Sequence, residues 1–230
     1  MKKCTVFLLA FALAEAGVAE EAVLNTEKAK FSYAVGLQIG QSLIRQGVEI
    51  DTEAFALALQ DSLAGREPRL PAAELQAVMQ KQEQAIKRKQ QAAAEINSAA
   101  GRRFLEENKN KEGVHELPNG LQYKVIKEGN GNRPQRSDSV NVHYRGTLID
   151  GREFDSSYRR GEPTTVRLNG VIKGWQETLP MMREGSKWQI FLPPELAYGQ
   201  GGAGAVIGPS ETLIFEIELI AVRQAKTGGK

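Results

Sequence analysis

One run of the chain, residues 72–117, contains no proline and constrains the fold more than any other feature. It is rich in alanine, glutamine, lysine and glutamate, which are good helix formers. The run predicts one helix from about Ala72 to Asn108, roughly 55 Å long at 1.5 Å per residue. The polar residues Gln82 and Lys89 interrupt its heptad pattern and argue against a continuous coiled coil. We therefore expect a long spacer helix with a solvated middle.

Two shorter helices are predicted before the spacer. The first starts at Thr26 and ends at Gly47, a natural C-cap glycine. Its apolar residues recur at every fourth position and form one stripe: Phe31, Val35, Ile39 and Leu43. Asp51 caps the second helix, which ends at Gly65, and Pro71 is expected as the first residue of the spacer.

These helices have too little apolar surface to enclose a core of their own. We therefore predict that the apolar stripe is buried between two copies of the chain, giving a homodimer through the N-terminal helices. Gly36 and Gly40 lie one turn apart and favour the close approach of another helix. The alternative is that the two glycines are incidental, because the close-packing rule comes from membrane helices.

The first residues have the layout of a secretory signal peptide. Lys2 and Lys3 precede an uncharged apolar run, 4–14, that is short for a membrane span. Cleavage is expected after Ala16 or Ala19, and a retained amphipathic helix is the alternative. Cys4 is the only cysteine, so the mature chain would offer neither a disulfide nor a thiolate.

Composition excludes several classes of function. The chain is 41% hydrophobic and 25% charged, as in soluble globular proteins, and its net charge of +2 favours neither nucleic acid nor an anionic membrane as partner. Its two histidines, His115 and His143, lack metal-ligand spacing, so neither a metal nor a cofactor is expected. A Ser-His-Asp arrangement through His143 stays open. The glycine-rich run 199–208 lacks the lysine of a phosphate loop.

The hydrophobic period changes after residues 118–120, Pro-Asn-Gly. From there the pattern alternates in short strands, at about 121–125, 140–147, 165–168, 187–191 and 211–222, around one small helix at 175–181. The fold class is therefore α+β. We expect a signal peptide at 1–19, a helical dimerisation domain with the spacer helix at 20–113, and an antiparallel sheet wrapped around a short helix at 114–230.

The stretch VHYRGTLIDGREFDSS, residues 142–157, is a strand followed by an Asp-Gly turn. Its returning arm places Phe154 and Asp155 opposite Tyr144 on the outgoing strand. With further apolar residues downstream, these side chains form either ordinary core or a lined apolar cleft.

This stretch and three later ones, VIKGWQETLPMM, LPPELAYG and GPSETLIFEIELI, resemble the FKBP family of peptidyl-prolyl cis-trans isomerases. FSYAVGLQIGQSL and NGLQYKVI resemble the N-terminal part of the macrophage infectivity potentiator (Mip) type of bacterial FKBP. The resemblance implies an FKBP-like C-terminal domain and an exported dimer. It implies a periplasmic location, with the outer membrane or cell surface as the alternative.

Carried over residue by residue, the resemblance implies two sets of site residues. The catalytic set is Tyr144, Phe154, Asp155, Tyr198 and Phe215. The substrate-binding set is Arg160, Val171, Ile172, Trp175 and Ile207. Trp175 would form the pocket floor, Arg160 and Tyr144 would hold Asp155, and the Tyr198 hydroxyl and Ile172 amide would donate to substrate carbonyls. The chain departs from the family at the rim, at Thr164, Gly170 and Ala203.

Such a pocket suits a reaction that breaks no bond. Rotation about the bond before proline has a barrier of roughly 18–20 kcal/mol and lowers the charge separation of the amide. A water-poor cleft disfavours the planar amide more than the twisted one. The implied partners are proline-containing unfolded polypeptides and macrolide inhibitors of the tacrolimus class. The alternative function is a chaperone that binds unfolded clients and isomerises them incidentally.

Overall fold

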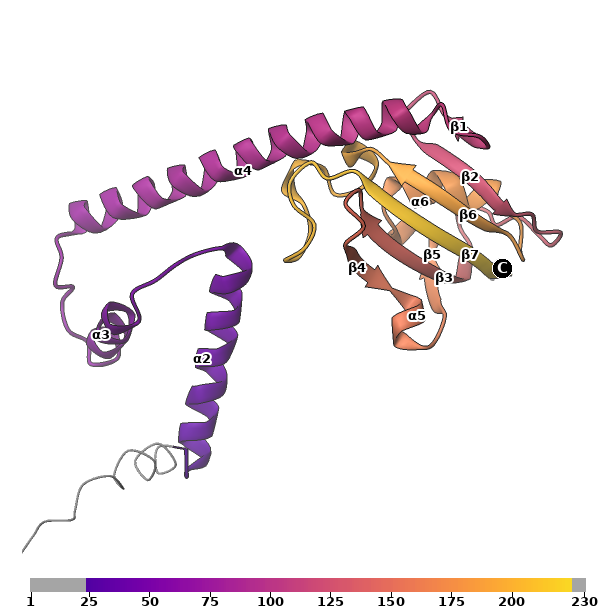
Figure 1. Ribbon diagram of the computed structural model, residues 1–230. Helices are drawn as coiled ribbons and strands as arrows, with labels where there is room; N and C mark the ends of the chain where they lie inside the picture. The colour runs from indigo at the N-terminus through magenta and orange to yellow at the C-terminus, as the bar shows by residue number, and fades with distance from the viewer. Residues whose placement is uncertain (1–23, 225–230) are drawn as a thin grey trace, which may run out of the picture. The chain divides into compact units, whose positions relative to one another are not determined.

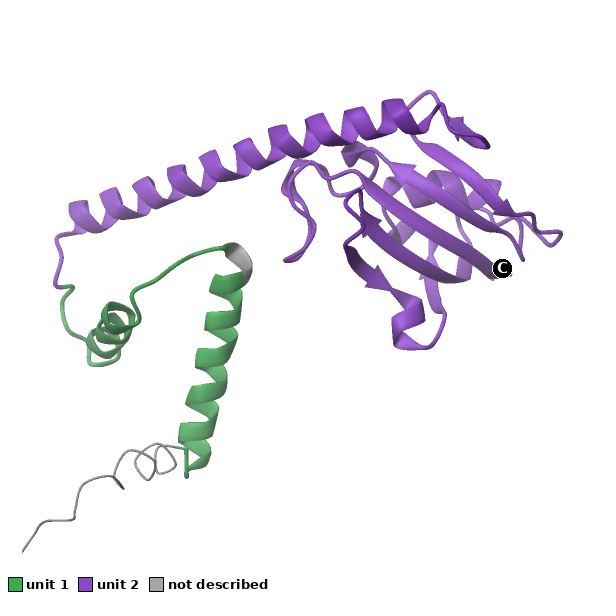
Figure 2. Ribbon diagram, viewed as in Figure 1, with its two compact units in different colours: residues 1–68 green, residues 69–230 purple. Residues whose placement is uncertain are grey.

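The computed structural model describes residues 24–224 (Figure 1), and its contacts divide the chain into two units, 1–68 and 69–230 (Figure 2). The predicted signal segment 1–19, with Cys4, lies outside the described residues. Within the part that the structure describes, no helix is both long and apolar enough to cross a bilayer. The predicted boundary at 113/114 stays a prediction.

The first unit contains helices α2 (Glu27–Gln46) and α3 (Thr52–Leu63). Both predicted starts are confirmed: the Thr26 hydroxyl accepts from the Ala29 amide, and the Asp51 carboxylate accepts from two amides of α3. Gly47 ends α2 in the left-handed conformation, at φ 64°. Large apolar side chains of both helices are exposed, among them Phe31 at 71% and Leu63 at 81%.

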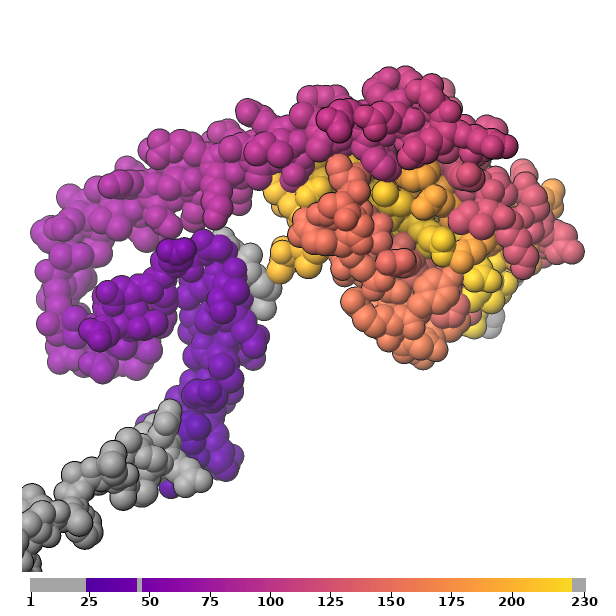
Figure 3. All heavy atoms as spheres, viewed as in Figure 1, coloured from indigo at the N-terminus to yellow at the C-terminus, as the bar shows by residue number. Residues whose placement is uncertain are grey.

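The second unit begins with the long helix α4 (Ala72–Asn108), whose bounds are those predicted. Pro71 precedes the helix as its N-cap, so its assignment as the first helical residue was wrong by one position. The middle of α4 is exposed, whereas its C-terminal part lies directly on the C-terminal strands (Figure 3). The apolar heptad position Ile96 is 68% exposed. The docked face therefore lies elsewhere on the helix.

The rest of the second unit is a seven-stranded antiparallel sheet with short helices (Figure 1). The strand order is β1-β2-β6-β7-β3-β4, and β5 also pairs with β3. The strands are β1 (Val114–Glu116), β2 (Gln122–Lys127), β3 (Ser139–Leu148), β4 (Glu153–Ser156), β5 (Thr164–Arg167), β6 (Lys187–Leu192) and β7 (Leu213–Arg223). The helices are α5 (Ser157–Arg160) and α6 (Lys173–Thr178), and short 3-10 turns complete the unit. The predicted α+β architecture is confirmed.

One face of this sheet packs on α6 and forms the core. Alternation along β3 buries Val140 and Val142 completely and leaves His143 and Arg145 toward the other face. Each fully buried aliphatic side chain contributes about 1.5–3 kcal/mol, so the sheet and α6 hold each other in place. Residues 114–116 form β1, which pairs with β2.

Candidate active site

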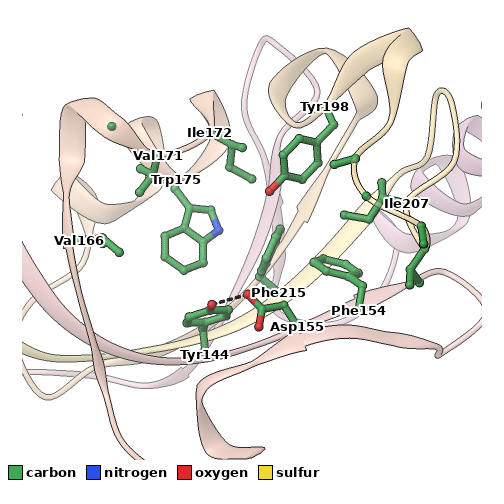
Figure 4. A pocket seen from close by; sticks show the side chains of 15 residues that line it. Tyr144, Phe154, Asp155, Val166, Val171, Ile172, Trp175, Tyr198, Ile207 and Phe215 are labelled. Atoms are coloured by element: carbon green, nitrogen blue, oxygen red, sulfur yellow. Dashed lines mark hydrogen bonds between the residues drawn. The ribbon is translucent and has the colours of Figure 1, made fainter. Parts of the chain in front are cut away.

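Four aromatic rings from three strands and α6 form the apolar part of a cavity of about 600 Å³ (Figure 4). The Trp175 ring stands edge-on to Tyr144 at 5.2 Å and to Phe215 at 5.3 Å between centroids. Phe154 stands edge-on to Phe215 at 5.5 Å. Each such pair stabilises the arrangement by about 0.5–1.5 kcal/mol beyond burial. The rings therefore hold one another in fixed orientations.

A glycine in the middle of β3 makes room for these rings. Gly146 pairs with Asp155 on β4 and with Phe215 on β7. A Cβ at this position would lie 2.5 Å from Phe154 Cζ and 2.9 Å from Phe215 Cε1. Sequence reasoning missed this residue, although a glycine inside a strand pattern is a known sign of close approach.

The polar edge of the cavity is built around Asp155. The Tyr144 hydroxyl donates to Asp155 Oδ2, and Arg160 Nη1 lies 2.6 Å from Asp155 Oδ1. Arg160 Nη2 also donates to Tyr144 Oη at 2.9 Å and to Thr164 Oγ1 at 3.0 Å. The Ser156 hydroxyl caps α5, the short helix that carries Arg160. One guanidinium thus fixes a carboxylate, a phenol and a rim threonine together.

Electrostatics fix the protonation of these groups. Burial alone would raise the pKa of Asp155, but the hydrogen bonds from Tyr144 and Arg160 outweigh it and hold that pKa below its usual value. Burial, and then the hydrogen bond to Asp155, raise the pKa of Tyr144. Burial and the nearby Asp155 charge raise the pKa of Tyr198. At neutral pH the site therefore presents one carboxylate and two protonated phenols.

The structure gathers the residues that the resemblance implied. Nine side chains line the one cavity: Tyr144, Phe154, Asp155, Val171, Ile172, Trp175, Tyr198, Ile207 and Phe215. Arg160 is not part of the lining and reaches it through Asp155 and Tyr144. The Tyr198 hydroxyl points into the cavity (Figure 4). Ile172 is the N-cap of α6. Their individual roles stay predictions.

Further lining residues were missed or placed only at the rim. Val166 of β5 lines the cavity, and its alternation with exposed neighbours could have revealed it. Ala205 and Val206 also line it, from a glycine-rich loop that has no periodic pattern. Gly170 and Ala203, noted as departures from the family, lie in the same lining.

The open alternative of a hydrolytic serine does not fit the geometry around His143. Its Nδ1 lies 2.9 Å from the Ser157 hydroxyl. That hydroxyl also accepts from the Tyr144 amide at 2.8 Å and contacts the Tyr144 carbonyl at 3.2 Å, and Ser157 is fully buried. Ser157 therefore ties β3 to the start of α5 and is inaccessible to a substrate.

Comparison with known proteins decides the family. Residues 131–220 match the family described as FKBP-type peptidyl-prolyl cis-trans isomerase, and residues 28–125 match the domain amino-terminal to it. The chain is 42% identical over 230 residues to the "Outer membrane protein MIP" of Legionella longbeachae, covering 98% of this chain and 99% of the relative.

The chain belongs to the FKBP family of peptidyl-prolyl cis-trans isomerases. This FKBP is also 43% identical over 205 residues to the "Peptidyl-prolyl cis-trans isomerase Mip" of Coxiella burnetii, covering 87% of this chain and 89% of the relative. The crystal structure of FkpA from Escherichia coli matches with a TM-score of 0.62 at 38% identity, over 87% of this chain and 99% of that one. The predicted family, fold and enzyme class are thus confirmed.

Proposed function

We propose that this FKBP isomerises X-Pro bonds in exported polypeptides by holding the twisted amide in its aromatic cavity. The observation that carries the proposal is the set of edge-to-face rings around Trp175, with Asp155 and the Tyr198 hydroxyl at its polar edge. The proline ring would lie on Trp175, which is 5% exposed and fixed on two sides by Tyr144 and Phe215.

The cavity favours rotation because the planar amide is more polar than the twisted one. Resonance makes the planar peptide bond resist rotation by roughly 18–20 kcal/mol. An apolar, water-poor wall solvates the charge-separated planar form poorly, while fixed donors hold the rotated carbonyl. The protonated Tyr198 hydroxyl and the Ile172 amide would supply those donors.

Asp155 has an orienting role in this proposal. Its pKa is lowered and its oxygens are held by Arg160 and Tyr144, so it neither gives nor takes a proton near neutral pH. The reaction needs no proton transfer, because rotation leaves every covalent bond in place. We infer that Asp155 fixes the Tyr144 ring against Trp175 and keeps the polar edge in shape.

A refolding assay tests the enzyme and its proposed site together. A proline-limited refolding protein is mixed with wild type, Asp155→Ala or Trp175→Ala. Wild type should shorten the slow phase, which lasts tens to hundreds of seconds unaided. Trp175→Ala should lose most of this effect. An unchanged slow phase with folded wild type would refute the proposal.

The homodimer is proposed from the first unit. Its apolar side chains stay exposed within one chain, with Phe31 at 71%, Ile44 at 79% and Leu63 at 81%. So much exposed apolar surface is typical of an interaction site. Sedimentation of the mature chain at micromolar concentration should show a dimer, and Phe31→Glu should shift it to a monomer. A wild-type monomer would refute the dimer.

Export and location rest on the signal-like first residues. We infer that cleavage follows Ala16 or Ala19 and that the mature protein lies in the periplasm, with the outer membrane or surface as alternatives. Mass determination of the protein from fractionated cells would measure both. An uncleaved cytoplasmic chain would contradict this part of the proposal.

A chaperone function is the second candidate, favoured by the same exposed apolar side chains of α2 and α3. If these helices bind clients, the chain 20–113 alone should suppress aggregation of an unfolded protein. If all such activity stays with residues 114–230, the chaperone hypothesis fails.

Binding of a tacrolimus-class macrolide is a separate proposal for the cavity. Its affinity should depend on the rim residues Thr164, Gly170 and Ala203, and a failure of tacrolimus to inhibit would count against it.

A further inference from the structure

The loop at residues 199–210, here called the pocket loop, supplies one wall of the cavity but is bonded mainly to itself. Ala203 and Ile207 exchange backbone hydrogen bonds of 2.9 and 3.2 Å, and the Ser210 amide donates to the Gly199 carbonyl at 2.9 Å. Gly202 has φ 65°, and a Cβ there would lie 2.3 Å from the Ile207 carbonyl oxygen. These bonds fix the internal shape of the loop and leave open what fixes its position.

Helix α4 supplies an attachment. Asn97 Nδ2 donates to the Pro209 carbonyl oxygen at 2.9 Å, across 112 residues of sequence. The neighbouring Gly208 leaves room for this amide, because a Cβ there would lie 3.2 Å from Asn97 Nδ2. One turn along α4, a Cβ on Gly101 would lie 2.2 Å from Thr212 Oγ1. The helix thus contacts both the end of the pocket loop and the residue that leads into β7.

The helix is itself held firmly against the sheet. The Phe104 ring lies 5.9 Å from Phe191, and the buried Asn108 side chain donates to Gln122 Oε1 at 3.0 Å. Gln122 in turn donates to the Leu105 carbonyl at 2.9 Å. Residues 97, 101, 104 and 108 recur on one face of a helix. Helix α4, which supports the pocket loop, is therefore itself anchored to the sheet, and Figure 3 shows it in contact with the yellow segment.

We propose that Asn97 is a positioning residue for substrate binding, acting through the pocket loop. Its hydrogen bond sets where Val206 and Ile207 stand at the mouth of the cavity. This inference rests on the proposed site. Because the loop lines the cavity outside the aromatic floor, a misplaced loop would weaken binding of substrate and transition state alike. Such uniform loss raises KM and leaves kcat in place.

Asn97→Asp is the sharpest test. Aspartate has nearly the same side-chain shape as asparagine, but it replaces the Nδ2 donor with an oxygen acceptor that faces the Pro209 carbonyl oxygen. Losing one such bond should raise KM for an X-Pro peptide about three- to tenfold, with kcat within about twofold. Hydrogen exchange at the Ile207 amide should quicken. Asn97→Ala should act in the same direction. Ser98→Ala is the control, since among residues 24–224 the Ser98 hydroxyl accepts a hydrogen bond within α4, from Arg102 at 3.0 Å, and its loss should change neither KM nor Ile207 exchange.

The outcomes separate positioning from general stability. A merely structural Asn97 would lower Tm and leave KM and Ile207 exchange unchanged, which would overturn the inference. A fall in kcat at constant KM would overturn it too. If wild type isomerises none of the tested peptides, the proposed active site fails. In that case, faster exchange of the Ile207 amide in both Asn97 variants, but not in Ser98→Ala, would still support the attachment of the pocket loop to α4 through Asn97.

Discussion

Arg160 Nη1 lies 2.6 Å from Asp155 Oδ1, and its second nitrogen lies 2.9 Å from the Tyr144 hydroxyl. The sequence alone did not establish that Arg160 reaches this carboxylate. Both charged side chains are partly exposed, so the pair contributes little to stability by itself. Its importance lies in orientation, because Tyr144 also packs edge-on against Trp175.

Replacing Arg160 should change the titration of Asp155. Because the folded-state pKa of Asp155 is lowered, its charged form contributes stability above the ordinary value near 3.8 and loses it as pH falls through the lowered value. Arg160→Met removes one cause of the lowering, so the pKa should rise, as NMR titration of the carboxyl carbon would show.

The same variant tests the orienting role of the pair. We expect kcat/KM of Arg160→Met to fall about three- to tenfold at neutral pH, as for a lost hydrogen bond to a charged group. Arg159→Met is the matched control, since Arg159 pairs with Glu153 at 3.3 Å, outside the cavity lining. An unchanged Asp155 titration would contradict this account of the polar edge.

Removing the floor indole should lower catalysis by more than the loss of stability explains. Trp175→Ala and Trp188→Ala delete indoles that are 5% and 7% exposed, and each should lower the free energy of unfolding by about 3–5 kcal/mol. Only Trp175 lines the cavity, so only its loss should reduce kcat/KM of the remaining folded enzyme about tenfold or more. Urea unfolding followed by circular dichroism, with peptide kinetics, measures both. Equal kinetic losses would contradict a specific role for Trp175.

Gly146→Ala should disturb the cavity through its rings. The added methyl would meet Phe154 and Phe215 at 2.5 and 2.9 Å, and the two rings would have to move apart. Overpacking of this kind costs about 1–3 kcal/mol. We expect a lower kcat/KM and shifted ring resonances in the NMR spectrum. Gly151→Ala is a poor control because of its φ of 88°, so Gly201→Ala, which has nothing within 4 Å and lies outside the cavity lining, is preferred.

Gly101→Ala should destabilise the second unit although alanine favours helix. In an open helix the change would stabilise by about 0.5–1 kcal/mol. Here the methyl would lie 2.2 Å from Thr212 Oγ1, so α4 would have to move from the sheet. Ala100→Gly, one residue along, gives the propensity reference. Thermal unfolding should show both variants below wild type; a stabilised Gly101→Ala would mean that α4 is not docked as described.

Local rules explain why the helices were predictable. Caps such as Thr26 and Asp51 act within three residues, and the proline-free run determines α4 without tertiary help. The residues missed act by close approach or by polar contact across the chain. Gly146 and Gly101 matter through an absent Cβ, and Asn97 through a carbonyl 112 residues away. Hydropathy carries no signal for either kind of contact.

The resemblance contributed what periodicity could not. Alternation in β3 places Tyr144 on the same face as Val142, but alternation alone does not distinguish a core position from a cavity position. The family motifs predicted that Trp175, Tyr198 and Ile207 belong to one site, and all three line the cavity. The pocket loop was not predicted, because its glycine-rich sequence has no hydrophobic periodicity and because its position depends on contacts with α4.

The solvent isotope effect on kcat/KM tests most directly whether the site works by solvating a rotated amide. The kcat/KM of the wild-type enzyme for an X-Pro peptide is measured in H2O and in D2O, at equivalent pH and pD well above the pKa of Asp155. Rotation without proton transfer predicts a ratio of about 1. A ratio of about 2 or more would show a proton in flight, and would contradict a cavity that acts by shape and polarity alone.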